Sequence, residues 1–361
     1  MTTPPPDSES GEYYSPIPRA ARVAVVGLGK MGIMHSAMAS MAPRCALAAI
    51  CDRKRQLGVH VKSMGVAAPF YESFSAMLAA EKPAGVIISA PQAAHADLAV
   101  EALRFGAGVL VEKPLAHTLE AARRIRDEAE AFPHLATGVA FMLAQHPVFN
   151  EARRLVAEGA IGRPHRYDAR MRLSQVFAPR KGWIYTKALS GGGVLINSGS
   201  HLLFLVQRLF GLPESVSALM RSHHSREVED DVRIQAAHAD GLTGEIECHW
   251  SLRGFPAQVH EMTIEGDAGR IELTDRHIVL ETGEQRRVVT EGELVRSPFT
   301  LTPHYYGHAY YEQVADFAAV LNGKRERCAV PVSEGYDVQR FLEAVYRAAE
   351  TNTHVDLSTI V

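Results

Sequence analysis

The segment RVAVVGLGKMGIMH, residues 22–35, decides the fold. It joins an apolar strand-like run to a turn with glycine at three set positions, and an apolar stretch of helical length follows. A strand, a G-x-G-x-x-G turn and a helix in this order are typical of a dinucleotide-binding βαβ unit. Gly27 permits the tight turn, Gly29 admits a pyrophosphate, and Gly32 lets the helix pack on the strand. The free N–H groups at the helix start favour phosphate.

An acidic residue at the end of the next strand indicates which dinucleotide is bound. Asp52 follows Gly32 by 20 residues, which is where a carboxylate accepts the ribose hydroxyls and repels a 2′-phosphate. The alternative is a glycine-rich turn with an unrelated surface aspartate. It is disfavoured because the strand, the turn, the helix and the aspartate all stand at the expected positions. The basic residues Arg53 to Arg55 could clamp a 2′-phosphate or could be a solvated helix start. We therefore expect NAD, with NADP less favoured.

Four further apolar segments of strand length follow at intervals that fit helices. They span residues 46–51, 85–91, 108–114 and 134–141. Their Val, Ile and Ala run without alternation, as in strands buried on both faces of a parallel sheet. Between the last two, Leu119, Ala122 and Ile125 recur at helical spacing after Thr118, which can cap a helix. This alternation predicts a doubly wound α/β domain over residues 21–140.

After residue 141 the pattern becomes typical of an antiparallel sheet. A helix is expected over residues 147–159 and another near 334–349. Strand-like segments with short polar turns lie between them, at residues 165–173, 215–220, 231–239, 244–252, 259–266 and 270–274. Strands in direct succession pair antiparallel. We predict a second α/β domain over residues 141–361.

Length and charge exclude several classes of protein. The chain has 361 residues, which fits two domains of about 150 residues each. With 38 Lys and Arg against 41 Asp and Glu, it has no global basic field to hold nucleic acid or an anionic membrane. Residues 1–20 are rich in Pro, Ser and acid, and we expect a disordered tail rather than a secretory signal. No apolar run reaches the roughly 18 residues of a membrane span, so a cytoplasmic protein is expected.

The cysteine and histidine patterns do not indicate a metal site. The cysteines are Cys45, Cys51, Cys248 and Cys328. They lie far apart, without CxxC or finger spacing, and are most simply reduced thiols. The 17 histidines include no HExxH, and the adjacent His223 and His224 fall in a polar stretch. We expect no metal ion.

The segment GVLVEKPL places a lysine where it could act on a substrate. Lys113 comes at the carboxyl end of a buried parallel strand, which faces the ligand crevice. Pro114 disfavours the helical region at Lys113 and keeps it extended. Burial beside a cationic nicotinamide would lower the pKa of Lys113, so it could share the proton of a reacting hydroxyl. A lysine that only neutralises Glu112 fits the spacing equally well.

The segment GGGVLINSGSHLLFLVQRLFG, residues 191–211, carries a second candidate pair. Asn197 and His201 are spaced i, i+4 and would share one face of a helix. A neutral histidine can accept a proton from an alcohol and return it, whereas asparagine can only hydrogen-bond. Taken alone, a single histidine on a helix is more often structural than catalytic.

Together these motifs resemble one family of oxidoreductases. The motifs are Gly27-x-Gly29-x-x-Gly32-x-x-His35, Ala90-Pro91-Gln92-x-x-His95, Glu112-Lys113-Pro114, and Gly191-Gly192-Gly193 followed by Asn197 and His201. With the closing segment, residues 310–352, they are similar to the glucose–fructose oxidoreductase, inositol dehydrogenase and rhizopine-catabolism (Gfo/Idh/MocA) family. The resemblance covers essentially everything after the tail.

The resemblance implies an N-terminal Rossmann domain and a C-terminal domain whose large, open antiparallel sheet forms homodimers or homotetramers. It implies a tightly held nicotinamide cofactor and the oxidation or reduction of a sugar, aminosugar or cyclitol. By position, Lys113 would orient the reacting hydroxyl and assist its deprotonation, His201 would be the general acid and base, and Asn197 would lie beside it. Trp183 could stack on a sugar face, or could be a packing tryptophan.

Positions expected to line the cofactor follow from the glycine turn and the same motifs. They are Gly27, Gly29, Lys30, Met31, Gly32, Asp52, Arg53, Ala90, Pro91, Gln92, His95, Glu112 and Lys113. Lys113, Trp183, Asn197 and His201 are expected to contact the substrate.

The chain also departs from the family pattern, which leaves the substrate open. Many members have Asp at the position of Asn197 and an acid at that of Leu205, and residues 142–145 replace a stretch that often holds arginine. Two other functions therefore stay in view. One is a cofactor-sensing regulator without turnover. The other is an enzyme that cleaves glycosides by transient oxidation, elimination and re-reduction.

Overall fold

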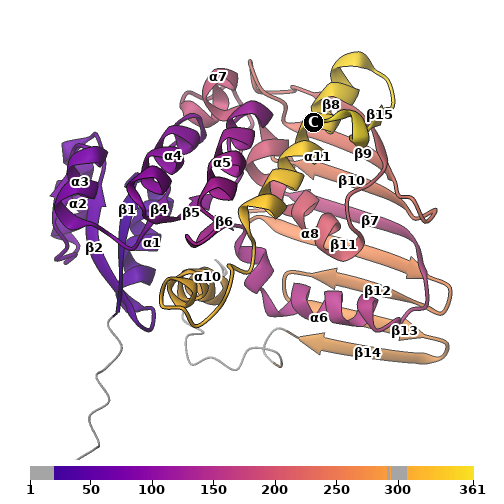
Figure 1. The fold of residues 1–361 in the computed structure, drawn as a ribbon. Helices are drawn as coiled ribbons and strands as arrows, with labels where there is room; N and C mark the ends of the chain where they lie inside the picture. The colour runs from indigo at the N-terminus through magenta and orange to yellow at the C-terminus, as the bar shows by residue number, and fades with distance from the viewer. Residues whose placement is uncertain (1–19, 291–292, 294–306) are drawn as a thin grey trace, which may run out of the picture.

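The computed structural model describes residues 20–290, 293 and 307–361 (Figure 1). The expected tail over residues 1–20 lies outside the described residues, except for Ala20. Within the described part the strands form two sheets, one of six strands and one of nine.

The six-stranded sheet is parallel throughout, in the order β3-β2-β1-β4-β5-β6. Its strands are β1 (Ala21–Val26), β2 (Cys45–Cys51), β3 (Phe70–Tyr71), β4 (Gly85–Ile88), β5 (Gly108–Glu112) and β6 (Thr137–Ala140). This order is that of a Rossmann fold, which confirms the predicted fold class. Five of these strands fall on the five predicted segments. The sixth, β3, is two residues long and carries no periodic signal.

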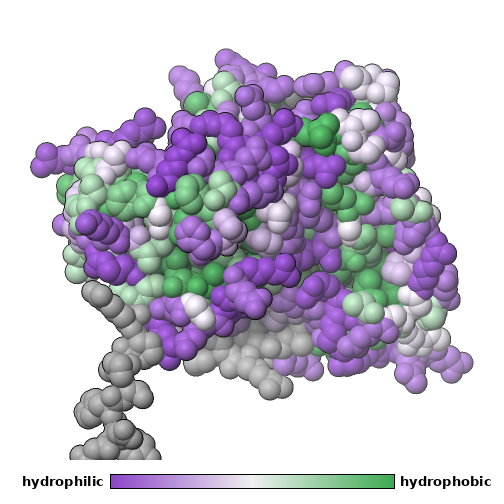
Figure 2. Space-filling model, in the orientation of Figure 1, coloured by the Kyte–Doolittle hydropathy of each residue, from purple (hydrophilic) through white to green (hydrophobic). Residues whose placement is uncertain are grey.

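Helices pack against both faces of this sheet. They are α1 (Lys30–Met41), α2 (Arg55–Ser63), α3 (Phe74–Glu81), α4 (His95–Phe105) and α5 (Leu119–Ala131). Helix α5 starts as predicted, because the hydroxyl of Thr118 accepts the N–H of Ala121. Figure 2 shows mostly hydrophilic side chains over α4 and α5, the solvent side of this helix layer.

The nine-stranded sheet runs β14-β13-β12-β11-β7-β10-β9-β8-β15. It consists of β7 (Pro164–Arg172), β8 (Ser215–Arg221), β9 (Asp231–Ala237), β10 (Thr243–His249), β11 (Val259–Gly266), β12 (Gly269–Thr274), β13 (His277–Thr282), β14 (Gln285–Thr290) and β15 (Val355–Asp356). All neighbours pair antiparallel except β7 and β10. The mostly antiparallel sheet was predicted, whereas β13, β14 and β15 were not.

One face of the nine-stranded sheet carries helices, as Figure 1 shows. These are α6 (Pro147–Ala157), α8 (Ser200–Phe210) and α11 (Val332–Thr351). Buried and more exposed residues alternate along β7, which explains which face of the sheet the helices cover. Tyr167, Ala169 and Met171 are buried beneath the helices. Arg166 and Arg170 point to the opposite face.

Helix α10 (Gly307–Leu321) crosses back to the six-stranded sheet. Its Val314 and Phe317 pack in one apolar cluster with Val23 and Ile87 of that sheet. Late parts of the chain therefore contribute to the core of the first sheet. The division into domains at residues 140 and 141 stays a prediction.

The helical stretch Lys187–Phe210 is long and apolar enough to cross a membrane by length and composition alone. It contains α7 (Lys187–Ser190), a π-helical turn (Leu195–Gly199) and α8. Because 83% of its apolar window is buried inside the fold, we interpret it as a core helix of the second sheet.

Candidate active site

The glycine turn between β1 and α1 has the shape of a phosphate cradle. Gly27 has a φ of +87°, and a Cβ there would lie 2.5 Å from the main-chain nitrogen of Ala90. A Cβ on Gly32 would lie 1.7 Å from the carbonyl oxygen of Gly27. Packing within the chain therefore requires both glycines.

Gly29 differs from these two glycines. Its φ of −68° suits any residue, and a Cβ there would meet no described atom within 4 Å. Among the described residues, no side chain caps the N-terminus of α1 at Gly29. The space above Gly29 and the uncapped N–H groups fit a diphosphate, so the turn suits the expected dinucleotide.

Asp52 ties the glycine turn to the end of β2. One carboxylate oxygen accepts the N–H of Leu28 and the other accepts the N–H of Lys54, both at 2.8 Å. Each oxygen keeps a further lone pair, so ribose hydroxyls can still bind there. The side chains of Lys30 and Arg53 are exposed, and Met31 is half-buried.

The loop after β4 is held by a buried histidine. His95 is 1% exposed, and its ring nitrogens lie 2.9 Å from the carbonyl of Ala90 and 3.2 Å from that of Leu115. It therefore connects the loop of Ala90, Pro91 and Gln92 to the loop after β5. Burial lowers the pKa of His95, although the two carbonyls oppose this. These contacts hold the two loops together, and the place of His95 beside the cofactor stays a prediction.

Glu112, at the end of β5, is buried and charged. Its carboxylate lies 2.7 Å from Nε2 of His35 and accepts the N–H of Lys113 at 3.0 Å. Burial raises the pKa of Glu112, but the hydrogen bond and charge of His35 and the charge of Lys113 bring it below its usual value. Glu112 thus has partners other than the ammonium group of Lys113.

The ammonium group of Lys113 reaches across to the second sheet. Its Nζ donates to the main-chain carbonyl of Asn197 at 2.5 Å. Burial lowers the pKa of Lys113, while the charge of Glu112 opposes this. The Lys113–Pro114 peptide is cis.

His201 lies where this contact is made. The sequence predicted one regular helix through Asn197 and His201, but Asn197 falls in the π-helical turn and His201 in the first turn of α8. The His201 ring meets Phe141 edge to face, with centroids 5.9 Å apart, and His260 at 6.0 Å. Burial, the charge of Lys113 and that of His260 hold the pKa of His201 well below its ordinary value, so this imidazole is neutral at pH 7.

Three glycines allow the turn before His201 to approach its neighbours. A Cβ on Gly191 would lie 2.0 Å from the carbonyl oxygen of His117, in the loop after β5. One on Gly192 would lie 2.0 Å from the hydroxyl of Tyr346. The sequence singled out these glycines as part of a motif but gave no sign of these contacts.

Glu229 holds this turn, and sequence reasoning missed it. Its buried carboxylate accepts the N–H of Gly193 at 2.9 Å, the N–H of Leu195 at 3.0 Å and the hydroxyl of Tyr346 at 2.9 Å. Burial raises the pKa of Glu229, and these donors oppose the shift. Glu229 follows the turn by more than 30 residues in a polar stretch, which gave no signal of this contact.

His260 of β11 was also missed. It is 1% exposed, and Asp275 accepts both its main-chain N–H and its Nδ1–H at 3.0 Å. Gln258 lies 3.0 Å from its Nε2. His260 therefore forms a fixed wall beside His201.

Trp183 lies at a short 3-10 turn, Trp183–Tyr185, and is 38% exposed. Trp250 is the fully buried tryptophan, and Tyr185 packs against it with centroids 5.8 Å apart. Trp183 is therefore not a core residue, and its contact with substrate stays a prediction.

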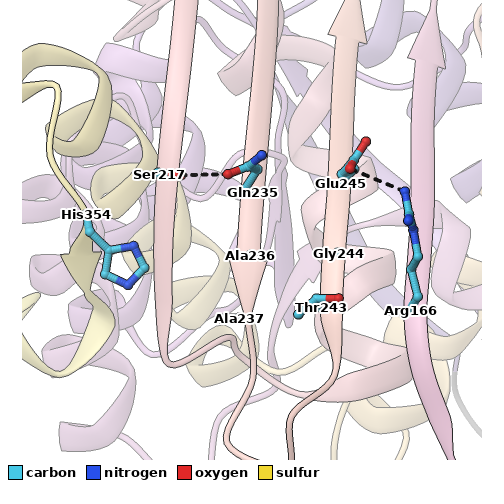
Figure 3. A pocket seen from close by; sticks show the side chains of 9 residues that line it. All are labelled: Arg166, Ser217, Gln235, Ala236, Ala237, Thr243, Gly244, Glu245 and His354. Atoms are coloured by element: carbon cyan, nitrogen blue, oxygen red, sulfur yellow. Dashed lines mark hydrogen bonds and ion pairs between the residues drawn. The ribbon is translucent and has the colours of Figure 1, made fainter.

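A hollow of about 300 Å³ lies elsewhere, on the uncovered face of the nine-stranded sheet. Figure 3 shows Arg166 directed toward Glu245, and Ser217 toward Gln235, across neighbouring strands. None of the predicted site residues lines it. Within the described ranges, no group of three or more His, Cys, Asp or Glu is placed to hold a metal ion.

Comparison with known proteins now identifies the family. The model described as "Oxidoreductase family, NAD-binding Rossmann fold" matches residues 21–136. The model described as "GFO/IDH/MocA C-terminal domain" matches residues 149–272. The chain belongs to the GFO/IDH/MocA family. This confirms the resemblance drawn from the motifs, and with it an NAD-binding Rossmann fold.

Individual relatives agree with this assignment. The D-glucoside 3-dehydrogenase of Escherichia coli (strain K12) is 27% identical over 93% of this chain and 97% of its own. The inositol 2-dehydrogenase of Rubrobacter xylanophilus is 32% identical over 39% of this chain and 41% of its own. A solved structure of levoglucosan dehydrogenase, in complex with NADH and levoglucosan, has a TM-score of 0.84 at 21% identity, covering 93% of this chain and 99% of that one. The last comparison supports the fold alone.

The open space at Gly29 generates the first prediction. Gly29→Ala should leave the melting temperature unchanged and weaken NAD binding about tenfold, because the new methyl group occupies the diphosphate position. Fluorescence titration with NAD and a thermal melt measure the two effects. Gly32→Ala is the contrast, since its Cβ meets backbone and should lower the melting temperature. Unchanged NAD affinity in Gly29→Ala would contradict the cradle.

The contacts of Glu229 generate the second prediction. Glu229→Gln should lower the free energy of unfolding by roughly 1–3 kcal/mol, because an amide NH₂ replaces one acceptor oxygen among buried donors. Urea unfolding measures it. Glu227→Gln, at an exposed neighbour, is the control and should change stability by less than about 0.5 kcal/mol. Equal effects in the two variants would show that Glu229 does not hold the turn.

Proposed function

We propose that this protein is an NAD-dependent dehydrogenase that acts on a CH–OH carbon of a sugar, aminosugar or cyclitol. The hydrogen bond from Lys113 to the carbonyl of Asn197 carries the proposal. It sets the lysine at the carboxyl end of β5 next to the turn that leads into His201, on the crevice side of a Rossmann sheet.

His201 would serve as the base for the hydroxyl proton. It is neutral because burial and the Lys113 charge lower its pKa, and its Nδ1 has no hydrogen-bond partner among the described residues. A neutral imidazole accepts a proton from an alcohol, and the imidazolium returns it when the reaction runs toward the alcohol. The wall formed by His260 and Phe141 limits how the ring can move.

Lys113 would orient the substrate oxygen and stabilise its charge as the proton leaves. Its Nζ carries three donors, and the Asn197 carbonyl uses one of them. NAD, when bound above the glycine turn, supplies the acceptor for the hydride of the carbinol carbon. Gly27 to Gly32 and Asp52 would hold it, with Ala90, Pro91 and Gln92 alongside.

The acceptor for Lys113 is the main-chain carbonyl of Asn197, so this contact does not depend on the side chain at position 197. The amide of Asn197 remains free to hydrogen-bond a substrate hydroxyl without acting as a base. The departure from aspartate therefore leaves the lysine and histidine arrangement in place.

The names of the relatives support a sugar or cyclitol as substrate. We include glycosides, because one relative that spans nearly the whole chain is named for a D-glucoside. Trp183, exposed at its turn, would present an aromatic face to a sugar ring.

The proposal extends to assembly and location. The uncovered face of the nine-stranded sheet carries cross-strand ion pairs such as Arg172–Glu261 at 2.6 Å and Arg233–Glu247 at 3.5 Å. We propose that this face pairs with a second copy, in a homodimer or homotetramer. The net charge of −3 and the free cysteines agree with a cytoplasmic enzyme that binds neither nucleic acid nor membranes.

Replacing either candidate catalytic residue tests the function. Lys113→Ala and His201→Ala should each lower kcat by roughly 10²–10⁴, because each removes a proton-handling group. NADH absorbance with a panel of sugars, glycosides and inositols measures it, and unchanged NAD affinity in His201→Ala shows that the cradle is intact. Exposed Lys62→Ala and His134→Ala are the controls. Near-normal turnover in His201→Ala would contradict the assignment.

The pH profile tests the state of His201. The pKa of His201 lies well below the ordinary value of about 6.5. The acid limb of the kcat/KM profile should therefore have its midpoint below pH 6.5. Burial lowers the pKa of His201 most, and electrostatic interactions with Lys113 and His260 lower it further. His260→Gln should therefore move this limb upward. An acid limb at or above pH 6.5 in the unaltered enzyme would show that His201 is not the base.

A further inference from the structure

A second cavity, of about 660 Å³, lies apart from the candidate active site. Residues of α6, the end of α8, the segment between α10 and α11, and the start of α11 line it. Figure 1 shows α6, α8 and α11 on the face of the nine-stranded sheet that carries helices. None of the predicted cofactor or substrate residues belongs to its lining. His201 lies in the first turn of α8 and Arg208 in its last, so the two sites are at opposite ends of one helix.

The cavity is rich in arginine. Its lining contains Arg153, Arg208, Arg325 and Arg327. Two of them are already paired within the protein. Arg208 binds Glu334 at 2.5 and 3.0 Å, and Arg325 binds Asp316.

The acids of the lining are also engaged. Glu334 is held by Arg208, and Asp337 lies 3.3 Å from Arg340, which is outside the lining. Arg153 and Arg327 are different, because neither has an ion pair or side-chain hydrogen bond with any residue that the structure describes. The cavity therefore presents two guanidinium groups whose charge the described protein does not neutralise.

The start of α11 adds to this positive field. Pro331 lines the cavity and immediately precedes this helix of 20 residues. Within the described chain, no side chain accepts its first N–H groups at the cap. A helix N-terminus favours anions, although here it only supplements the two arginines.

We propose that this cavity binds a phosphate group, held by Arg153 from α6 and Arg327 from the segment before α11. The guanidinium fork matches phosphate oxygens in pairs, and arginine remains charged at every physiological pH. The volume lies in the range of small-molecule sites, so the phosphate can belong to free inorganic phosphate or to a phosphorylated sugar. The site is separate from the hydride chemistry and does not rest on it.

Isothermal titration calorimetry on the full-length protein, saturated with NAD, tests the proposal. NAD fills the glycine turn, so that phosphate binding there does not contribute heat. The probes are inorganic phosphate, glucose 6-phosphate and, as the uncharged control, glucose, all at constant ionic strength. We expect binding heat from inorganic phosphate and from glucose 6-phosphate, with dissociation constants in the millimolar range or below. Glucose should give no heat that depends on the cavity. Tighter binding of glucose 6-phosphate assigns the site to a phosphorylated sugar, and equal binding assigns it to free phosphate.

The double variant Arg153→Ala/Arg327→Ala should weaken phosphate binding by about tenfold or more. Both residues are exposed, so the variant should fold, and an unchanged melting temperature without phosphate verifies this. Lys324→Ala is the matched control, because it removes an exposed charge from the same segment outside the cavity lining. Equal phosphate affinity in the double variant and the control, or no phosphate binding by the unaltered protein, would overturn the proposal.

Discussion

The arrangement of the site depends on one hydrogen bond, from the ammonium group of Lys113 to the main-chain carbonyl of Asn197. It connects the carboxyl end of β5 in the Rossmann sheet to the π-helical turn before α8, which lies on the helix-covered face of the second sheet. Gly191, without a Cβ, lies against the carbonyl of His117 and lets this turn approach the loop after β5. Glu229 fixes the same turn through the N–H groups of Gly193 and Leu195. A lysine and a histidine that are 88 positions apart in the sequence therefore come close enough for the lysine's charge to lower the pKa of the histidine.

Burial then sets the protonation states. Burial disfavours a charged group, so the pKa values of both Lys113 and His201 are lowered. The charge of Lys113 lowers the pKa of His201 further. Glu112 stays ionised despite its burial, because His35 and Lys113 stabilise its charge. The outcome is a neutral imidazole next to an ammonium group, which is the pairing that an alcohol needs to lose a proton and have its oxygen stabilised.

Local signals in the sequence predicted much of this structure. The glycine turn, five of the parallel strands and the Thr118 cap all depend on neighbours within a few residues, and each is in place. Contacts between distant segments gave no such signal. Glu229 reaches the turn from a later loop, His260 reaches His201 from another strand, and the π-helical turn at Asn197 reflects packing that spacing alone does not encode. His95 was recognised as part of a motif, but its contacts with two carbonyls depend on how two loops meet.

A crystal structure of the protein with NAD and a sugar from the substrate panel tests the central claim most directly. The account predicts that one carbinol oxygen lies within hydrogen-bonding distance of both Nζ of Lys113 and a ring nitrogen of His201, with its carbon facing the nicotinamide. A substrate oxygen that contacts neither group, or a lysine and a histidine that face separate cavities, would contradict it.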